Sequence, residues 1–125
     1  MIKKNITYKD YNDVVRTEPF YFNMDEAEAT ELELSKSGGM SETLKRIVES
    51  DDRAAMYQFF KKFIMMSYGI KSEDGKRFIK SEKMSEEFLQ TRAYVALINE
   101  LAKDETGEAA ANFFNGVLDF VNPAQ

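Results

Sequence analysis

The sequence contains no cysteine, no histidine and no tryptophan, and these absences limit the chemistry available to it. Without cysteine there is no disulfide, no thiolate nucleophile and no thiolate metal ligand. Without histidine the chain lacks the side chain best suited to proton transfer near neutral pH, which is also the commonest metal ligand. A Ser-His-Asp triad, a Cys-His pair and an ordinary zinc site are therefore excluded. We expect no enzymatic activity and no cofactor, and the lack of cysteine favours a reducing cytoplasm.

Long apolar runs are also missing, since none approaches the roughly 20 residues that span a bilayer. The start of the chain, Met1-Ile2-Lys3-Lys4-Asn5, has two lysines without an apolar stretch behind them, so we expect no signal peptide. The net charge is −5 and the pI is about 4.9, whereas phosphate contacts need a concentrated basic face. We therefore expect neither nucleic-acid binding nor membrane binding.

What remains is typical of one globular domain. The 125 residues are 43% hydrophobic and 31% charged, a balance unlike that of disordered chains. Ten phenylalanines must be buried in a core or against a partner. We predict a single domain over residues 1–125, with a β-hairpin in residues 1–22 and a helical body in residues 23–121.

The N-terminal hairpin is predicted from alternation and turn chemistry. Ile6 and Tyr8 alternate with polar residues, Phe20-Tyr21-Phe22 favours a strand, and residues 10–13 are rich in turn formers. Pro19 cannot donate a ladder hydrogen bond, so we expect the second strand to be an edge or to be interrupted there.

Helices are predicted over residues 23–36, 41–49, 53–68, 85–103 and 108–120. Asn23, with Glu26 three residues later, is expected to cap the first helix, and Gly69 is expected to end the third. The third helix is the best defined, because apolar residues recur at i, i+3, i+4, i+7 and i+8. The predicted apolar stripes are Met56, Phe59, Phe60, Phe63 and Ile64 in the third helix, Met24, Ala27, Glu31 and Leu34 in the first, and Phe88, Arg92, Val95, Ile98 and Ala102 in the fourth.

Residues 70–83 differ from the helices around them. Basic side chains outnumber acidic ones here, and Asp74-Gly75 favours a tight turn. We predict a short hairpin or ordered loop, and we leave two interpretations open: a solvated hairpin, or a surface that contacts phosphate or an acidic partner. The fold class is therefore α+β and predominantly α-helical, with about five helices, an N-terminal β-hairpin and a short hairpin or loop near residues 70–83.

Carboxylates offer two further hypotheses, and we favour neither. Asp25, Glu26, Glu28, Glu31 and Glu33 could bind a divalent metal, but a solvated face that complements the helix dipole accounts for them. Glu73-Asp74-Gly75 resembles the start of a calcium loop, although the EF-hand spacing is not met. A carboxylate-dependent metal hydrolase is the remaining enzyme hypothesis.

Seven methionines are many for this length. Methionine is adaptable and is common at surfaces that hold varied apolar partners, although a stripe at helical spacing is more often core. The positions that we would test for exposure are Met40, Met65, Met66 and Met84.

Several segments form a recognisable pattern in order along the chain. The principal segment is Ser67-Tyr68-Gly69-Ile70-Lys71-Ser72-Glu73-Asp74-Gly75-Lys76-Arg77-Phe78-Ile79-Lys80-Ser81. Phe20-Tyr21-Phe22-Asn23, Glu31-Leu32-Glu33-Leu34-Ser35 and Gly38-Gly39 precede it, and Ser85-Glu86-Glu87-Phe88, Gln90-Thr91, Ala93-Tyr94 and Phe113-Phe114-Asn115-Gly116-Val117 follow it. Together, over nearly the whole chain, these segments resemble small tail assembly chaperones of long, non-contractile-tailed (siphovirus-type) phages of Gram-positive bacteria.

The resemblance implies a function. Such chaperones act in the cytoplasm of the infected host, where they bind the long, helical tape measure protein and keep it from aggregating while tail tube subunits polymerise around it. They are not expected in the mature virion. The resemblance also implies further partners: the tail tube protein, a longer form of the chain made by ribosomal frameshifting, and a second copy of the chain. It implies no catalytic residues.

We therefore predict partner-binding residues on the methionine-rich helices and the basic segment. They are Leu32, Met40, Met65, Met66, Lys71, Lys76, Arg77, Phe78, Lys80 and Met84. Two other functions stay open: a small phage regulatory or adaptor protein, and a tail or neck completion component of the virion.

Overall fold

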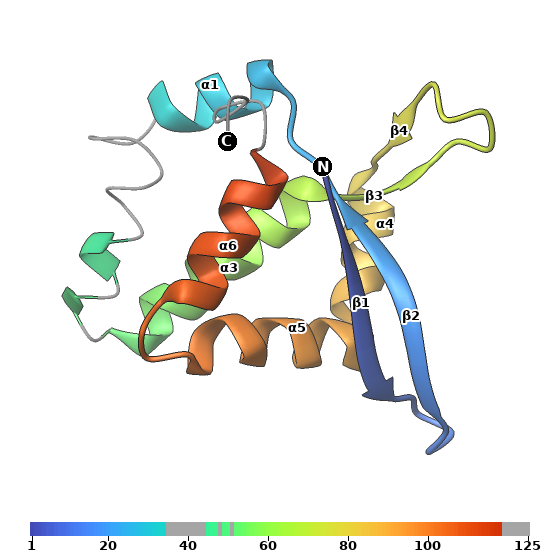
Figure 1. The fold of residues 1–125 in the computed structure, drawn as a ribbon, viewed down its shortest axis with the longest axis horizontal. Coiled ribbons are helices and arrows are strands. Elements are labelled where there is room, and N and C mark those ends of the chain that lie inside the picture. Colours follow the sequence, from blue (N-terminus) through green and yellow to red (C-terminus); the bar gives the residue numbers. More distant parts are fainter. Residues whose placement is uncertain (35–44, 48, 51, 119–125) are drawn as a thin grey trace.

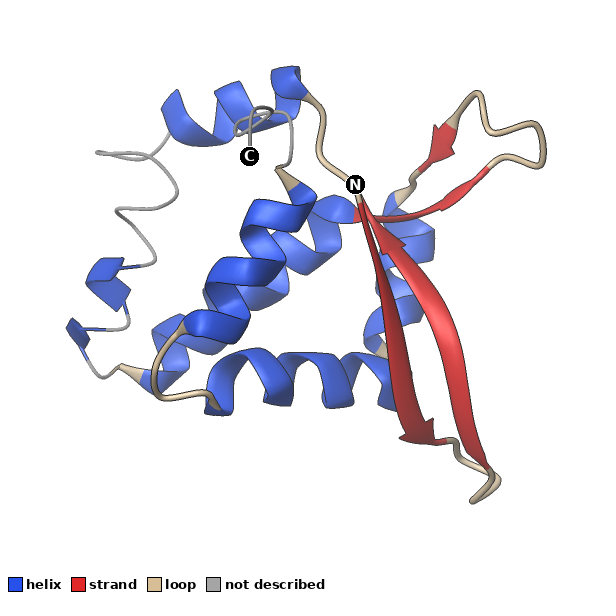
Figure 2. Ribbon diagram, viewed as in Figure 1, coloured by secondary structure: helices blue, strands red, loops and turns tan. Residues whose placement is uncertain are grey.

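A computed structural model gives the fold (Figures 1 and 2) and describes residues 1–34, 45–47, 49–50 and 52–118. The strands are β1 (Ile2–Lys9), β2 (Val15–Phe22), β3 (Tyr68–Lys71) and β4 (Phe78–Ile79). The helices are α1 (Glu26–Leu34), α3 (Arg53–Ser67), α4 (Glu82–Leu89), α5 (Arg92–Lys103) and α6 (Glu108–Val117). The predicted α+β, predominantly helical fold class is confirmed. Residues 45–47 and 49–50 are helical, and the rest of the helix expected over 41–49 lies outside the described residues.

The strands form one antiparallel sheet in the order β1-β2-β3-β4. The N-terminal hairpin is confirmed, with Ile2 opposite Phe22 at one end and Lys9 opposite Val15 at the other. β2 continues through Pro19 without interruption, but it pairs with β3 only at its last two residues. Among the described residues, the edge of β2 that faces away from β1 therefore has no strand partner before Tyr21. Pro19 lies on this free edge, as predicted.

Two hairpins leave the helices on the same side of the molecule. In Figure 1 the β1–β2 hairpin extends to the lower right and the β3–β4 hairpin to the upper right, while α1, α3, α5 and α6 lie to the left. We call the two hairpins the hairpin arms and the helices α1 and α3–α6 the helical body. The junction between arms and body lies where β2, β3 and the end of α3 meet, because the Asn23 amide donates to the Ser67 carbonyl at 2.8 Å.

The core is an aromatic cluster centred on α3 and α6. Phe63 and Phe114 have ring centroids 4.3 Å apart, and Phe113 reaches the sheet by an edge contact with Phe22 at 5.2 Å. The predicted stripe of the third helix is confirmed, since Phe59, Phe60, Phe63 and Ile64 are buried and Met56 packs against them. The helix predicted from residue 108 is also confirmed as far as Val117.

The first helix begins later than predicted. Its cap is Asp25, whose carboxylate accepts from the Glu28 amide at 2.8 Å, while the Glu28 carboxylate accepts from the Asp25 amide at 3.1 Å. A capping box is present as predicted, but it begins at Asp25 and not at Asn23. Both side chains can accept a hydrogen bond from a helix amide, so the sequence alone does not distinguish the two positions. Of the predicted apolar stripe, Met24 is buried and Ala27 is exposed, while Ala29 is buried instead. The side chains of Glu31 and Leu34 lie outside the described residues.

The fourth predicted helix is two helices. α4 ends at Leu89, and Thr91 caps α5 by accepting from the Tyr94 amide at 3.2 Å. Neither glycine nor proline marks this break, so sequence periodicity does not detect it. The predicted stripe is confirmed at Phe88, Ile98 and Ala102, which are buried. It is wrong at Arg92 and at Val95, which is 46% exposed, whereas Ala93 is fully buried.

Gly69 does not end the third helix but lies inside β3, opposite Tyr21. The helix ends at Ser67, whose hydroxyl donates a hydrogen bond to the Phe63 carbonyl at 2.8 Å. Glycine is required at position 69 by close packing, because a Cβ there would stand 2.6 Å from both the Ile79 carbonyl oxygen and the Phe78 ring. Glycine is therefore needed at position 69 so that the strands can pack closely, and not because it terminates the helix.

Candidate partner-binding surface

The β3–β4 arm carries the basic segment on a turn fixed by polar contacts. The Ser72 amide donates to the Arg77 carbonyl and the Gly75 amide to the Ser72 carbonyl, each at 2.9 Å. Gly75 takes a φ of 74°, which suits glycine and fulfils the predicted tight turn. The hydroxyl of Ser72 donates to the Asp74 carboxylate at 2.6 Å. These contacts hold the loop without burying apolar surface.

The Asp74 carboxylate stabilises this turn by accepting two hydrogen bonds. The Ser72 hydroxyl, and next the Lys76 amide, hold the pKa of the Asp74 carboxyl below its ordinary value because both hydrogen bonds favour the charged form. Lys76 and Arg77 are exposed, and their cationic groups make no ion pair within the described residues. The tip of the arm therefore offers two cations to a partner.

At the base of the same arm, two predicted site residues pack against the sheet. The ammonium of Lys71 lies 4.7 Å from the centroid of the Tyr21 ring, within cation–π range. Phe78 is half-buried and covers Gly69. Lys71 therefore keeps its charge at the surface, whereas part of the Phe78 ring fills a space in the sheet.

Lys80 has an internal role that its sequence position did not reveal. Its ammonium donates to both oxygens of Glu28 at 2.7 Å, to the Asn23 carbonyl at 3.1 Å and to the Met66 carbonyl at 2.9 Å. One side chain thus joins the end of β4 to the start of α1 and the end of α3. With its charge neutralised and its donors satisfied, Lys80 fastens the β3–β4 arm to the helical body.

The methionines border a hollow beside this lysine. A space of about 340 Å³ is lined by Glu28, Met65, Met66, Lys80, Ser81, Glu82 and Ser85. Met65 and Met66 are half-buried, as is Met84 on the neighbouring helix α4. Ser85 closes the base by donating to the Met65 carbonyl at 2.8 Å. The hollow is therefore partly apolar, and its one lysine is already engaged by a carboxylate.

The structure brings some of the predicted site residues together and separates others. Met65, Met66 and Lys80 share the hollow, Lys71 and Phe78 lie at the base of the β3–β4 arm, and Lys76 and Arg77 lie at its tip. Met40 and the side chain of Leu32 lie outside the described residues.

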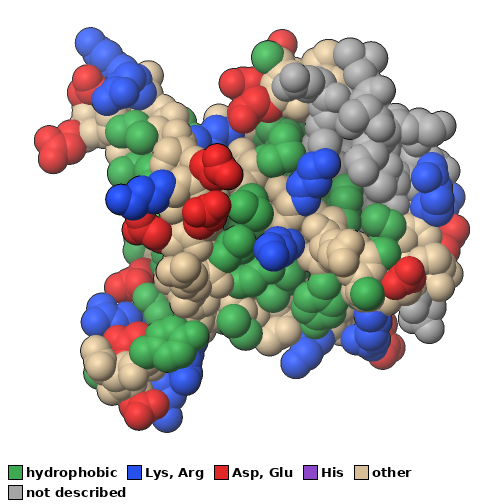
Figure 3. Space-filling model, turned by 180° about the vertical axis from the view of Figure 1, so that it is seen from behind, with side chains coloured by type: hydrophobic (Ala, Val, Ile, Leu, Met, Phe, Trp, Pro, Cys, Tyr) green, Lys and Arg blue, Asp and Glu red, His purple; other side chains and the backbone are tan. Residues whose placement is uncertain are grey.

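The sequence analysis missed the tip of the β1–β2 arm. Tyr11 is 70% exposed, Val14 51% and Val15 68%, and the Arg92 guanidinium lies 4.6 Å from the Tyr11 ring centroid. The signal was available, because Val14 and Val15 directly follow the predicted turn, where no helix was expected to cover them. Figure 3 shows both arm tips from behind, standing away from the body with a notch between them.

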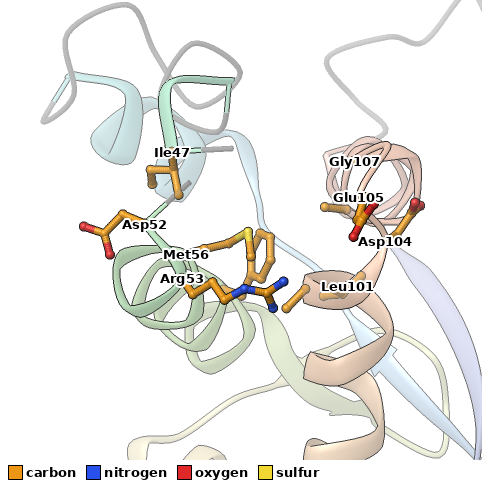
Figure 4. Close-up of a pocket in the computed structure, with 11 residues that line it drawn as sticks. Ile47, Asp52, Arg53, Met56, Leu101, Asp104, Glu105 and Gly107 are labelled. Atoms are coloured by element: carbon orange, nitrogen blue, oxygen red, sulfur yellow. The ribbon is translucent and has the colours of Figure 1, made fainter. Parts of the chain in front are cut away.

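A second pocket, of about 230 Å³, lies where the start of α3, the end of α5 and the start of α6 meet. Figure 4 shows Arg53 and Met56 reaching into it from one side, with Asp104 and Glu105 on the other. The Asp104 carboxylate accepts from the Thr106 hydroxyl at 2.6 Å and from the Ala109 amide, in the first turn of α6, at 2.8 Å. The Thr106 bond first, and the Ala109 bond next, hold the pKa of Asp104 below its ordinary value. Its carboxylate therefore has a structural role.

The part of the chain that the structure describes holds no group of three or more histidine, cysteine, aspartate or glutamate residues placed to bind a metal. In the acidic cluster, Asp25 caps α1 and Glu28 receives Lys80. The same described part contains no helix long and apolar enough to cross a membrane.

Comparison with known proteins supplies one match. Residues 1–121 match the family model described as phage tail assembly chaperone. No curated protein and no solved structure matches the chain. Because the match covers almost the entire sequence, the chain belongs to the phage tail assembly chaperone family.

Proposed function

We propose that this tail assembly chaperone binds the tape measure protein of a siphovirus-type phage and keeps it soluble while tail tube subunits polymerise around it. The observation that carries the proposal is the family match over residues 1–121. The function needs binding surface and no catalytic residue, so we further propose that the chain catalyses no reaction.

The surface of the described residues supports a binding role. The two arms carry exposed apolar side chains at one tip and unpaired cations at the other. The methionines beside the Lys80 hollow are half-buried, and methionine adapts to varied apolar partners. A client with an amphipathic helix needs both kinds of contact.

Co-expression tests the proposal. The tape measure protein of the phage that encodes this chain is produced alone and together with it, and its soluble fraction and co-purification are measured. We expect the tape measure protein to be recovered mainly in pellets when alone and in a soluble complex when the chaperone is present. Unchanged solubility and no co-purification would contradict the proposal and would favour a regulatory or adaptor role.

We also propose that the chain acts in the host cytoplasm and leaves before the virion is complete. Quantitative mass spectrometry of purified particles from a Gram-positive host tests this proposal. We expect the tube protein at high copy number and this chain at trace level or below detection. Stoichiometric presence would instead indicate a tail or neck completion component.

A further inference from the structure

In the part of the chain that the structure describes, the strands contribute lysines and no carboxylate to the outer face of the sheet. Side chains alternate between the two faces of a strand, and Ile6 and Phe22 mark the face that packs on the helical body. The opposite face receives Lys3 and Lys9 from β1 and Lys71 from β3. Its remaining members are neutral: Asn5, Thr7, Val15, Thr17, Pro19, Tyr21, Gly69 and Phe78.

Two contacts confirm this assignment of faces. The Thr7 and Thr17 hydroxyls lie 2.8 Å apart across the strand pair, and Lys71 stands over the Tyr21 ring. Apart from Tyr21, every side chain that β1 and β2 contribute to this face is exposed. We call these residues the outer sheet face.

The charges of the packed face are neutralised, whereas those of the outer sheet face are not. On the packed side Lys4 pairs with Glu100 and Arg16 pairs with Glu18. Lys3 and Lys9 make no ion pair within the described residues. The Lys71 ammonium lies over the Tyr21 ring and makes no ion pair with a described residue, and a ring positions an ammonium group without cancelling its charge.

The three lysines are spaced along the sheet. Lys3 stands opposite Tyr21, so Lys3 and Lys71 flank one aromatic ring. Lys9 lies six residues further along β1, which corresponds to roughly 20 Å of extended strand. A helix of about 13 residues covers that length.

We propose that the outer sheet face binds an acidic segment of the tape measure protein, with carboxylates paired to Lys3, Lys9 and Lys71. This inference rests on the proposed function and adds the position and chemistry of the contact. Since the chain as a whole carries a net charge of −5, its remaining surface repels an acidic segment and directs it to the one sheet face that lacks carboxylates. Asn5, Thr7 and Thr17 add hydrogen-bonding groups, and Tyr21 adds an aromatic surface.

The same lysines suit nucleic acid less well. Three separated lysines, with no arginine among them, do not form the dense basic stripe that phosphate backbones require. A DNA duplex therefore serves as a competing probe in the test.

The test compares two triple charge reversals. The first, Lys3→Glu/Lys9→Glu/Lys71→Glu, inverts the outer sheet face. The control, Lys61→Glu/Lys62→Glu/Lys103→Glu, makes the same charge change at exposed positions of α3 and α5. Binding of each full chain is measured against peptides of about 20 residues that tile the tape measure protein, and against the DNA duplex, at low and high salt.

We expect the wild type to bind acidic peptides and to lose affinity at high salt. The outer-face reversal should weaken binding by about tenfold or more, while the control stays within about threefold, because it leaves the contacting lysines intact. Circular dichroism confirms the fold of both variants. The milder Lys3→Gln/Lys9→Gln/Lys71→Gln variant replaces the reversal if the latter does not fold, and should weaken binding by several-fold.

Other outcomes overturn the inference. Equal binding by the outer-face variants and the control, a preference of the wild type for basic peptides, or tighter binding of the DNA duplex would each do so. If the outer-face reversal still keeps the tape measure protein soluble with unchanged affinity, the proposed function stands and the client contact lies elsewhere. If the wild type binds neither peptides nor the whole tape measure protein, the proposed function itself fails, and this inference fails with it.

Discussion

The helical body and the hairpin arms are built from different interactions. In the body, phenylalanines from α3 and α6 pack ring against ring, and Phe60 and Phe63 are each only 1% exposed. In the arms, aspartates fold the turns by accepting backbone amides, as Asp74 does for Lys76. Apolar side chains at the tips stay in solvent, Tyr11 most of all. Buried apolar packing is thus concentrated in the body, and exposed apolar and cationic side chains are found on the arms.

The largest expected effect lies in the body. Phe60→Ala should lower the free energy of unfolding by about 3–5 kcal/mol, because it removes a buried ring and leaves a cavity. Urea unfolding followed by circular dichroism measures the loss. Val95→Ala is the matched control, and since Val95 is 46% exposed it should change stability by less than about 0.5 kcal/mol. A loss under about 1 kcal/mol for Phe60→Ala would place that ring on a binding surface instead of in the core.

At the junction of body and arm, Gly69→Ala should lower the free energy of unfolding by about 1–3 kcal/mol, because the added methyl group overpacks the sheet. The new methyl group would meet the Ile79 carbonyl and the Phe78 ring at 2.6 Å. Gly75→Asn at the arm tip is the control, because asparagine tolerates a positive φ and position 75 has open space around it. Equal thermal unfolding midpoints for the two variants would show that the sheet does not constrain position 69.

A smaller effect is expected from replacing Lys80, which joins the β3–β4 arm to the helical body. Lys80→Met should lower the free energy of unfolding by about 1–2 kcal/mol, since the Glu28 carboxylate and two carbonyls lose a charged donor that is only partly exposed. Lys76→Met, at the exposed tip of the same arm, should leave the unfolding midpoint nearly unchanged while weakening client binding. If both variants unfold alike, Lys80 contributes no more to stability than an ordinary surface lysine.

The smallest expected effect is confined to the arm and depends on pH. The folded-state pKa of Asp74 is lowered, so its contribution to stability is present above the ordinary aspartate pKa and is lost as pH falls through the folded value. The protection factors of the amides of residues 72–77, which correct for the pH dependence of intrinsic exchange, should therefore fall below about pH 4. Asp74→Asn should remove most of that pH dependence without altering exchange in α3. A wild-type profile that stays flat down to the global acid transition would contradict this role of Asp74.

The sequence predicted the body better than the junctions, for physical reasons. The 3.6-residue spacing of Phe59, Phe60 and Phe63 is a local signal that reports burial directly. The break at Thr91 carries no glycine or proline and depends on one side-chain cap. The partnership of Lys80 with Glu28 joins residues 52 apart, so no local pattern contains it.

The proposed binding residues also differ in how far the sequence indicates them. Lys3 and Lys9 were not among the predicted partner-binding residues, because their shared face and its lack of carboxylates depend on the register of β2 and the position of β3 among the described residues. Lys71, Lys76 and Arg77 were identified from composition and proved accessible. Lys80 belongs to the same basic segment, yet it is only partly exposed and is paired with Glu28.

We propose that the helical body stabilises the fold while the hairpin arms hold the client. Hydrogen exchange with mass spectrometry, recorded for the chaperone alone and in complex with the tape measure protein, distinguishes these two roles. We expect new protection in residues 1–22 and 68–81, with exchange in α3 and α6 unchanged. Protection confined to the helical body, with both arms exchanging as in the free protein, would contradict it.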